Sequence, residues 1–144
     1  MGIEWGSHLA TGVDWQDSHH RELFKRINRL LDAMAAGYGK EEVARLFNFL
    51  DEYFAVHFEA EGQAMERHNY PGAATHAAEH ARFIESITRL RKEFDNGPSL
   101  KLVISVEREV VDWLLNHVAG MDKKLGNFVK SATGREGAPL KSHP

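Results

Sequence analysis

Glycine and proline divide the chain into four long stretches, and this division is the strongest constraint on its fold. The interruptions lie at Gly37 and Gly39, at residues 69–72 (Asn-Tyr-Pro-Gly), at residues 96–98 (Asn-Gly-Pro) and from Gly134 onward. Within each stretch apolar residues recur every three or four positions, which is the pattern of an amphipathic α-helix. No stretch alternates between apolar and polar residues for long enough to predict a β-strand. The sequence therefore predicts an all-α fold.

The four predicted helices cover approximately residues 17–36, 40–67, 73–94 and 99–131. Asp17 and Ser99 are suitable N-caps for the first and fourth helices, and Gly37 or Gly39 is a suitable C-terminal stop for the first. Long amphipathic helices joined by short loops pack as an up-down-up-down four-helix bundle. We therefore expect this architecture.

The two ends of the chain differ from the helical stretches. The first 16 residues contain large apolar side chains, namely Trp5, Leu9, Val13 and Trp15. They predict an extended N-terminal segment that packs on the bundle. Residues 132–144 are polar and aperiodic, so they are expected to form a disordered tail, and residues 1–131 a single domain.

The composition excludes several kinds of site and partner. The 144 residues include no cysteine, which excludes disulfides, thiolate metal sites and thiol nucleophiles. The formal net charge of −3 provides no basic field for nucleic acid. Neither a secretory signal peptide nor an apolar run long enough to span a bilayer is found, so we expect a cytoplasmic protein without membrane insertion. The nine histidines are the unusual feature.

Five of these histidines fall on the apolar faces of the predicted helices: His20, His57, His76, His80 and His117. His57 with Glu61, and His76 with His80, are four residues apart and so lie on one side of their helices. A single inward histidine is more often a hydrogen-bonded core residue than a metal ligand. Burying five without partners, however, would cost a few kcal/mol for each. A metal site built from all four helices explains them best.

The ligand spacing argues against two familiar kinds of metal site. Ferritin-like di-iron proteins need Glu-x-x-His on two helices, and no histidine of this chain follows a glutamate by three positions. The His-Glu-x-x-His motif of zinc proteases is also absent. What is left is a site rich in histidine and poor in carboxylate, for which iron, copper and zinc are all candidates.

Taken in order, the motifs resemble those of the hemerythrin family, in particular the single-domain bacteriohemerythrins. The matching motifs are Thr11-Gly12-Val13, Asp17-x-x-His20-x-x-Leu23-Phe24, His57-Phe58-x-x-Glu61-x-x-x-Met65, Tyr70-Pro71, His76-x-x-x-His80-x-x-Phe83 and Trp113-Leu114-x-x-His117-x-x-x-x-Asp122. Together they extend over about residues 5–130.

The resemblance implies a non-haem di-iron centre, with Fe(II) or Fe(III) ions joined by an oxo or hydroxo bridge. It assigns His76, His80 and His117 to one iron, His20 and His57 to the other, and Glu61 and Asp122 as bridges. The iron with two histidines would then have a free coordination position for dioxygen. Asp122 rests on the resemblance alone, because a step of five residues turns an ideal helix about 140° beyond His117.

The resemblance also implies a function in oxygen storage or delivery, with an apolar dioxygen pocket formed by Leu23, Phe58, Trp113, Leu114 and Val118. We expect reversible binding rather than catalysis, because no acid or base other than His19 lies beside the implied ligands. An oxygen or redox sensor that acts through a separate signalling partner is the alternative. An oxidase is a candidate recipient of the oxygen, and a monomer or weak oligomer is expected.

Three positions depart from the family pattern. His19 stands where glutamine is usual, Gln16 replaces a usual apolar residue, and Gly62 replaces a usual glutamate. Because His19 points about 100° away from His20 on a helix, His20 is the predicted ligand of this tandem pair. These departures are expected to affect oxygen affinity and autoxidation more than metal binding.

Overall fold

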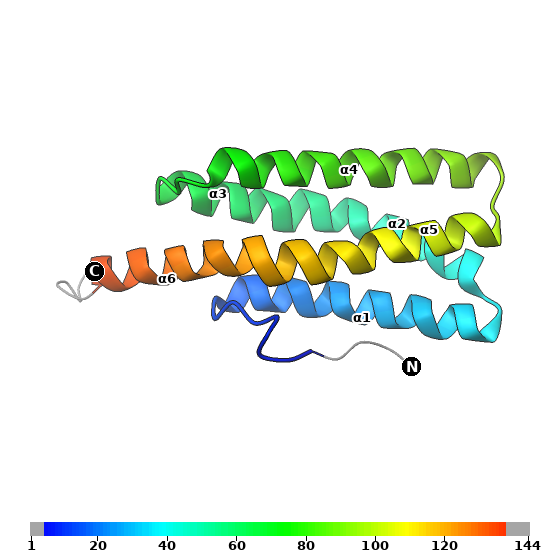
Figure 1. Cartoon of the computed structure of the whole chain (residues 1–144), viewed down its shortest axis with the longest axis horizontal. Coiled ribbons are helices and arrows are strands. Elements are labelled where there is room, and N and C mark those ends of the chain that lie inside the picture. Colours follow the sequence, from blue (N-terminus) through cyan, green and yellow to red (C-terminus); the bar gives the residue numbers. More distant parts are fainter. Residues whose placement is uncertain (1–4, 138–144) are drawn as a thin grey trace.

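A computed structural model of the protein describes residues 5–137, most of which form four long helices (Figure 1). The first is α1 (Asp14–Ala36) and the third is α4 (Ala73–Asn96). The second is a continuous helix made of α2 (Gly39–Tyr53), η1 (Phe54–Phe58) and α3 (Glu59–Arg67), and the fourth is made in the same way of α5 (Leu100–Asp112), η2 (Trp113–Asp122) and α6 (Lys123–Gly137). Successive helices run in opposite directions, which confirms the predicted all-α four-helix bundle.

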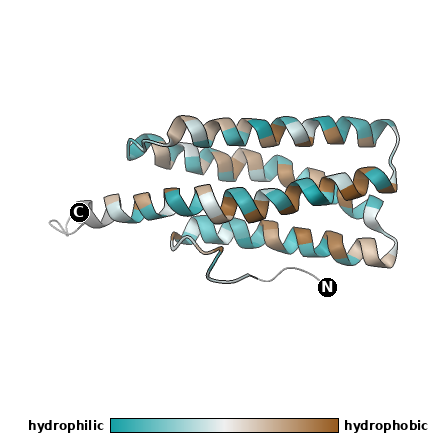
Figure 2. Cartoon of the chain, viewed as in Figure 1, coloured by the Kyte–Doolittle hydropathy of each residue, from teal (hydrophilic) through white to brown (hydrophobic). Residues whose placement is uncertain are grey.

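The helices pack through their apolar faces. Figure 2 shows hydrophobic and hydrophilic residues alternating along each helix, as amphipathic helices require. Leu30 of α1, Leu50 of α2 and Val103 of α5 are completely buried. Each such side chain contributes about 1.5–3 kcal/mol through its removal from water. No helix in the described part of the chain is long and apolar enough to cross a membrane.

Two predicted helix ends are confirmed by their local geometry. Gly37 ends α1 in the left-handed conformation with φ 88°, which glycine adopts without steric cost. Ser99 precedes α5, and its hydroxyl accepts a hydrogen bond from the Leu102 N–H at 3.2 Å. These contacts satisfy backbone groups that have no partner inside a helix.

The prediction that Asp17 caps the first helix is wrong. The helix begins at Asp14, and Asp17 lies buried in its first turn. The Asp17 carboxylate accepts hydrogen bonds from Thr11 N–H at 2.7 Å, the Thr11 hydroxyl at 3.0 Å and Gly12 N–H at 3.1 Å. Asp17 thus binds the preceding segment to the helix, and this segment packs on the bundle through buried Leu9 and through Trp5, which contacts Phe24 edge-on.

The fourth helix continues to Gly137, beyond the predicted end at residue 131. The sequence predicts a stop at Gly134, but a glycine within a helix costs only about 1 kcal/mol, so the helix can continue through it. Part of the predicted disordered tail is therefore helical. Residues 138–144, on which the rest of that prediction falls, lie outside the described residues.

Two segments of the bundle depart from α-helical geometry. In η1 and η2 the backbone is π-helical, with hydrogen bonds that join residues five apart instead of four. Both segments continue smoothly into the α-helices on either side, because the flanking residues keep right-handed helical dihedral angles. π-Helical segments are rare in proteins, and those that do occur are often found at functional sites. Here η1 contains His57, and η2 contains both His117 and Asp122.

Candidate metal centre

The seven predicted ligands meet inside one half of the bundle. His20 lies early in α1, whereas His57 and Glu61 lie late in the second helix, and alternating helix directions bring such positions to the same end. His76 and His80 lie early in α4, and His117 and Asp122 late in the fourth helix. All seven side chains are buried, and His80 is the most exposed at 7%. The structure therefore brings the whole predicted set together.

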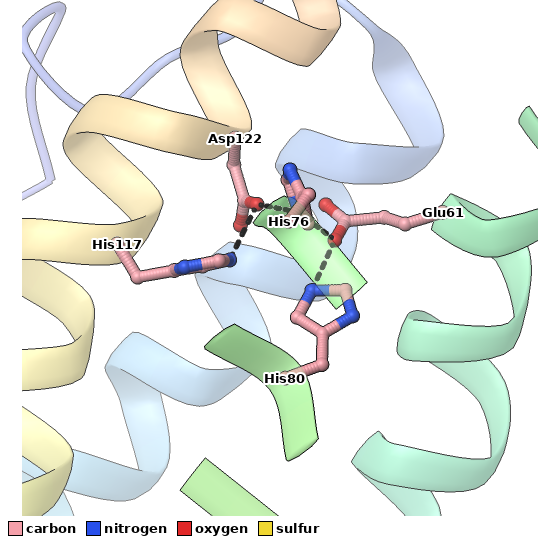
Figure 3. A group of neighbouring side chains, drawn as sticks. All are labelled: Glu61, His76, His80, His117 and Asp122. Carbon is pink, nitrogen blue, oxygen red and sulfur yellow. Dashed lines mark hydrogen bonds and ion pairs between the residues drawn. The ribbon is translucent and has the colours of Figure 1, made fainter. Parts of the chain in front are cut away.

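The side chains form two groups, in each of which the ligand atoms lie within 4.8 Å of one another. One group contains three histidines, His76, His80 and His117 (Figure 3). The other contains two histidines, His20 and His57. Glu61 and Asp122 belong to both groups. The arrangement is that of two neighbouring metal positions that share two carboxylates.

Glu61 divides its two oxygens between the groups. Its Oε1 lies 3.1 Å from His76 Nε2 and 3.0 Å from His80 Nε2, on the side with three histidines. Its Oε2 lies 3.1 Å from His57 Nε2, on the side with two. A carboxylate in this orientation presents one oxygen to each metal position.

Asp122 divides its oxygens in the same way. Its Oδ1 lies 3.0 Å from both His76 Nε2 and His117 Nε2, and its Oδ2 lies 2.9 Å from His20 Nε2. The two carboxylates thus face each other as a pair of bridges, one from α3 and one from the end of η2.

The π-helical segment η2 explains how Asp122 reaches the centre. An α-helix would turn it about 140° beyond His117. Hydrogen bonding between residues five apart places two residues with this spacing nearly above one another, so both side chains point inward. The signal in the sequence is the five-residue spacing itself, which periodicity analysis based on 3.6 residues per turn does not detect.

The residues present fit a pair of metal ions. Buried His80 Nε2, His117 Nε2 and Asp122 Oδ1 all point into the centre, where they lie at ion-pair distance from other ligand atoms but make no hydrogen bond of good geometry within the described part of the chain. His20 Nε2 and His57 Nε2 face each other at 3.2 Å. Buried polar atoms that make no hydrogen bond are costly, and metal coordination would use them. A donor set of imidazole and carboxylate suits iron as well as zinc or copper.

Without metal, the histidines and carboxylates of the centre shift each other's pKa. Burial disfavours the charged ring of His57, but the facing carboxylates of Glu61 and Asp122 outweigh it and raise the pKa to about 9. The pKa of His76 also rises to about 9, for the same reasons. Burial and the Asp122 charge oppose ionisation of Glu61, yet the imidazoles of His57 and His76 hold its pKa well below the usual range. In the metal-free protein, protonated His57 and His76 therefore supply positive charge that offsets the carboxylates of Glu61 and Asp122.

Metal affinity is expected to rise with pH between about 6.5 and 9, because a metal must displace the protons of His57 and His76. The same raised pKa values stabilise the metal-free fold fully below about 6.5, and this contribution is lost as the pH rises through 9. Chelator competition at several pH values measures the affinity, and an indicator dye measures the released protons. An affinity that does not change over this interval would contradict the protonation states described above.

Gln16 is part of the centre, although the sequence showed it only as a departure from the family pattern. Its buried amide donates hydrogen bonds to Glu61 Oε2 at 2.8 Å and to the Asp122 carbonyl oxygen at 3.3 Å. A Cβ atom on Gly126 would lie 2.9 Å from Gln16 Oε1, so the glycine leaves room for this amide. The available signal was spacing, because Gln16 precedes His20 by four residues and shares its face.

Two further residues lie against His57. The ring of buried Tyr53 stacks on it, with centroids 4.7 Å apart, and burial together with the charges of Asp122 and Glu61 raises the tyrosine pKa. His19, which is half-buried, contacts His57 from α1. Burial and the nearby rings of His57 and His20 lower the pKa of His19. The inward ring of the tandem pair is His20, as predicted.

The five predicted pocket residues are all buried: Leu23, Phe58, Trp113, Leu114 and Val118. Phe58 stacks on His80 with ring centroids 3.8 Å apart, and Trp113 stacks on His117 at 3.7 Å. These two aromatic rings therefore lie against the group with three histidines. Their part in a dioxygen pocket stays a prediction.

Comparison with known proteins agrees with this centre. Residues 11–129 match the family model described as the hemerythrin HHE cation binding domain. The chain is 31% identical to a bacteriohemerythrin of Methylococcus capsulatus over 118 residues, covering 82% of this chain and 88% of that protein. It is 32% identical to a bacteriohemerythrin of Pseudomonas aeruginosa over 126 residues, covering 83% of this chain and 76% of that protein. It is also 27% identical to a hemerythrin-like protein of Naegleria gruberi over 123 residues, covering 85% and 89%. The chain belongs to the hemerythrin family.

Proposed function

We propose that this protein binds dioxygen reversibly at a di-iron centre and thereby stores or delivers oxygen. The observation that supports the proposal is the unequal division of histidines around two shared carboxylates, with three on one side and two on the other. A metal position with fewer protein ligands leaves room for a small external ligand. The position beside His20 and His57 is therefore the one we assign to dioxygen.

The residues of the chain have distinct parts in this proposal. Iron, when bound, supplies the electrons and the coordination position that dioxygen requires. Glu61 and Asp122 would hold both ions, and the Gln16 amide fixes the orientation of the Glu61 carboxylate through its hydrogen bond to Oε2. The buried side chains Leu23, Leu114 and Val118 exclude water from the centre.

We further propose that dioxygen is a ligand here and not a substrate that is consumed. The side chains assigned to the pocket are aliphatic or aromatic, and they supply no group that exchanges protons near neutral pH. Catalysis of peroxide chemistry would need such a group beside the bound ligand, whereas His19 contacts the outer Nδ1 of His57 and not its metal-facing Nε2.

An anaerobic-to-aerobic optical titration of the iron-loaded protein tests the function. We expect two irons per chain, a nearly colourless reduced form, and a coloured form with oxygen that reverts when oxygen is removed. The His117→Ala variant is the control, because it removes a ligand from the group with three histidines and should change both iron content and spectrum.

Three results would contradict the proposal. One zinc per chain, or no metal, would remove its basis. Steady turnover of peroxide with a reductant would indicate an enzyme. Capture of a partner that depends on oxygen, without reversible oxygen uptake, would indicate a sensor.

A further inference from the structure

His19 belongs to neither group of ligands, yet it makes one of the shortest contacts to the metal centre. Its Nδ1 lies 2.8 Å from Nδ1 of His57. The two rings meet edge-on, with centroids 5.0 Å apart and planes at 81°. This distance is within the range of a hydrogen bond between two ring nitrogens. It joins α1 to η1 on the outer side of His57.

The position of the shared proton follows from the other side of the His57 ring. His57 Nε2 lies 3.1 Å from Glu61 Oε2 and 3.2 Å from His20 Nε2, so it is the nitrogen directed at the metal position. A neutral imidazole that binds a metal through Nε2 carries its proton on Nδ1. His57 is therefore the donor of this hydrogen bond, and His19 is the acceptor.

The outer nitrogens of three other histidine ligands are held less closely. Nδ1 of His117 lies 3.4 Å from Oε1 of Glu79, a partly exposed carboxylate. Nδ1 of His20 and Nδ1 of His76 are buried without a hydrogen-bond partner among the residues that the structure describes. Metal-bound histidines usually donate this proton to a carboxylate, a backbone carbonyl or water. His57 differs from this usual arrangement because the partner of its Nδ1 is the imidazole of His19.

His19 also lies where its contact can be altered without opening the core. A surface pocket of about 180 Å³ is lined by His19, His57 and Tyr53, with Glu22 and Glu52 among its other residues. His19 itself is only half-buried, whereas His57 is 1% exposed. The pair therefore connects a fully buried ligand to the surface of the bundle.

We propose that His19 is a positioning residue for His57: it accepts the Nδ1–H of His57 and so holds Nε2 toward the metal. This inference rests on the metal centre of the proposed function but not on dioxygen binding. Replacing the acceptor by an aliphatic side chain leaves the Nδ1–H unpaired and the ring free to turn, so binding on the side with two histidines becomes weaker. A glutamine oxygen at the same position restores an acceptor.

Zinc binding to the full chain tests the proposal, because zinc needs no dioxygen and gives sharp nuclear magnetic resonance spectra. The His19→Leu variant is expected to lose about 10–100-fold in affinity for the metal on this side, as outer hydrogen-bond partners of metal ligands typically do. The His19→Gln variant should recover most of it. His8→Leu, which removes an exposed histidine outside the centre, is the matched control and should bind like the unaltered protein.

Histidine side-chain nitrogen spectra give the second readout. The zinc-loaded protein should show the His57 proton on Nδ1 and protected from exchange with water, and His19→Leu should remove the protection. The inference is overturned if His19→Leu binds zinc within about twofold of the unaltered protein, if His19→Gln loses as much affinity as His19→Leu, or if the proton resides on Nε2. A protein that holds two metals but fails to take up oxygen reversibly would overturn the proposed function and leave this inference standing.

Discussion

Replacing Glu61 with alanine is expected to abolish metal binding at both positions, not at one. Each Glu61 oxygen faces a different histidine group, at 3.0–3.1 Å from the nearest ring nitrogens. The substitution therefore removes a ligand from both positions and a negative charge that offsets the charge of two metal ions. Elemental analysis after ferrous iron loading and desalting measures the metal content, which should fall from two per chain to nearly none.

The control for this substitution is His80→Ala. His80 belongs to the group with three histidines only, so its loss should weaken one position and leave the other with all its ligands. A Glu61→Ala protein that still retained one tightly bound metal would show that the carboxylate serves a single position. Far-ultraviolet circular dichroism of both metal-free variants checks that the helices are intact.

The Trp113→Ala substitution is expected to lower the free energy of unfolding of the metal-free protein by about 3–5 kcal/mol. The Trp113 ring stacks on His117 with centroids 3.7 Å apart and on Phe83 with centroids 4.2 Å apart, and its plane lies within 12° of each. Alanine would leave a cavity between two helices and would also remove the surface that orients His117. Urea denaturation without metal isolates the packing effect from metal binding.

Trp15→Ala is the matched control, because Trp15 is half-buried and contacts His19 and His57 only at ring distances near 6 Å. Its loss should cost about 1 kcal/mol, as for a typical substitution. Equal losses for the two tryptophans would contradict the expected cost of emptying the buried site of Trp113.

The sequence predicted the bundle well because its evidence is local. Apolar residues every three or four positions define the inner face of each helix, and Gly37 and Ser99 act through contacts within a few residues. The histidines on those faces could be assigned to the interior for the same reason. Their convergence on one centre follows from the antiparallel order of the helices, which the short loops impose.

The features that could not be predicted depend on tertiary contacts. Aspartate is a residue type that favours the N-cap position, but three hydrogen bonds from Thr11 and Gly12 hold Asp17 inside the first turn. Gln16 and His19 are polar residues whose partners, Glu61 and His57, are about 40 residues away along the chain. Nothing in a helical pattern indicates such distant partners. Asp122 is predicted as a ligand only from the resemblance to the hemerythrins, and the π-helical backbone of η2 explains why its side chain points into the centre.

The π-helical segment η2 has a consequence for how the chain can change in length. A segment with hydrogen bonds between residues five apart accommodates an extra residue relative to an α-helix, so all later residues are rotated from where an unbroken helix would put them. Gly126 must still meet Thr11 and Gln16 after this rotation. Insertions and deletions should therefore be tolerated in the loops at either end of the bundle. The loss of one residue between His117 and Asp122, in contrast, would turn the Asp122 carboxylate away from the metal centre and Gly126 of α6 away from Thr11 and Gln16.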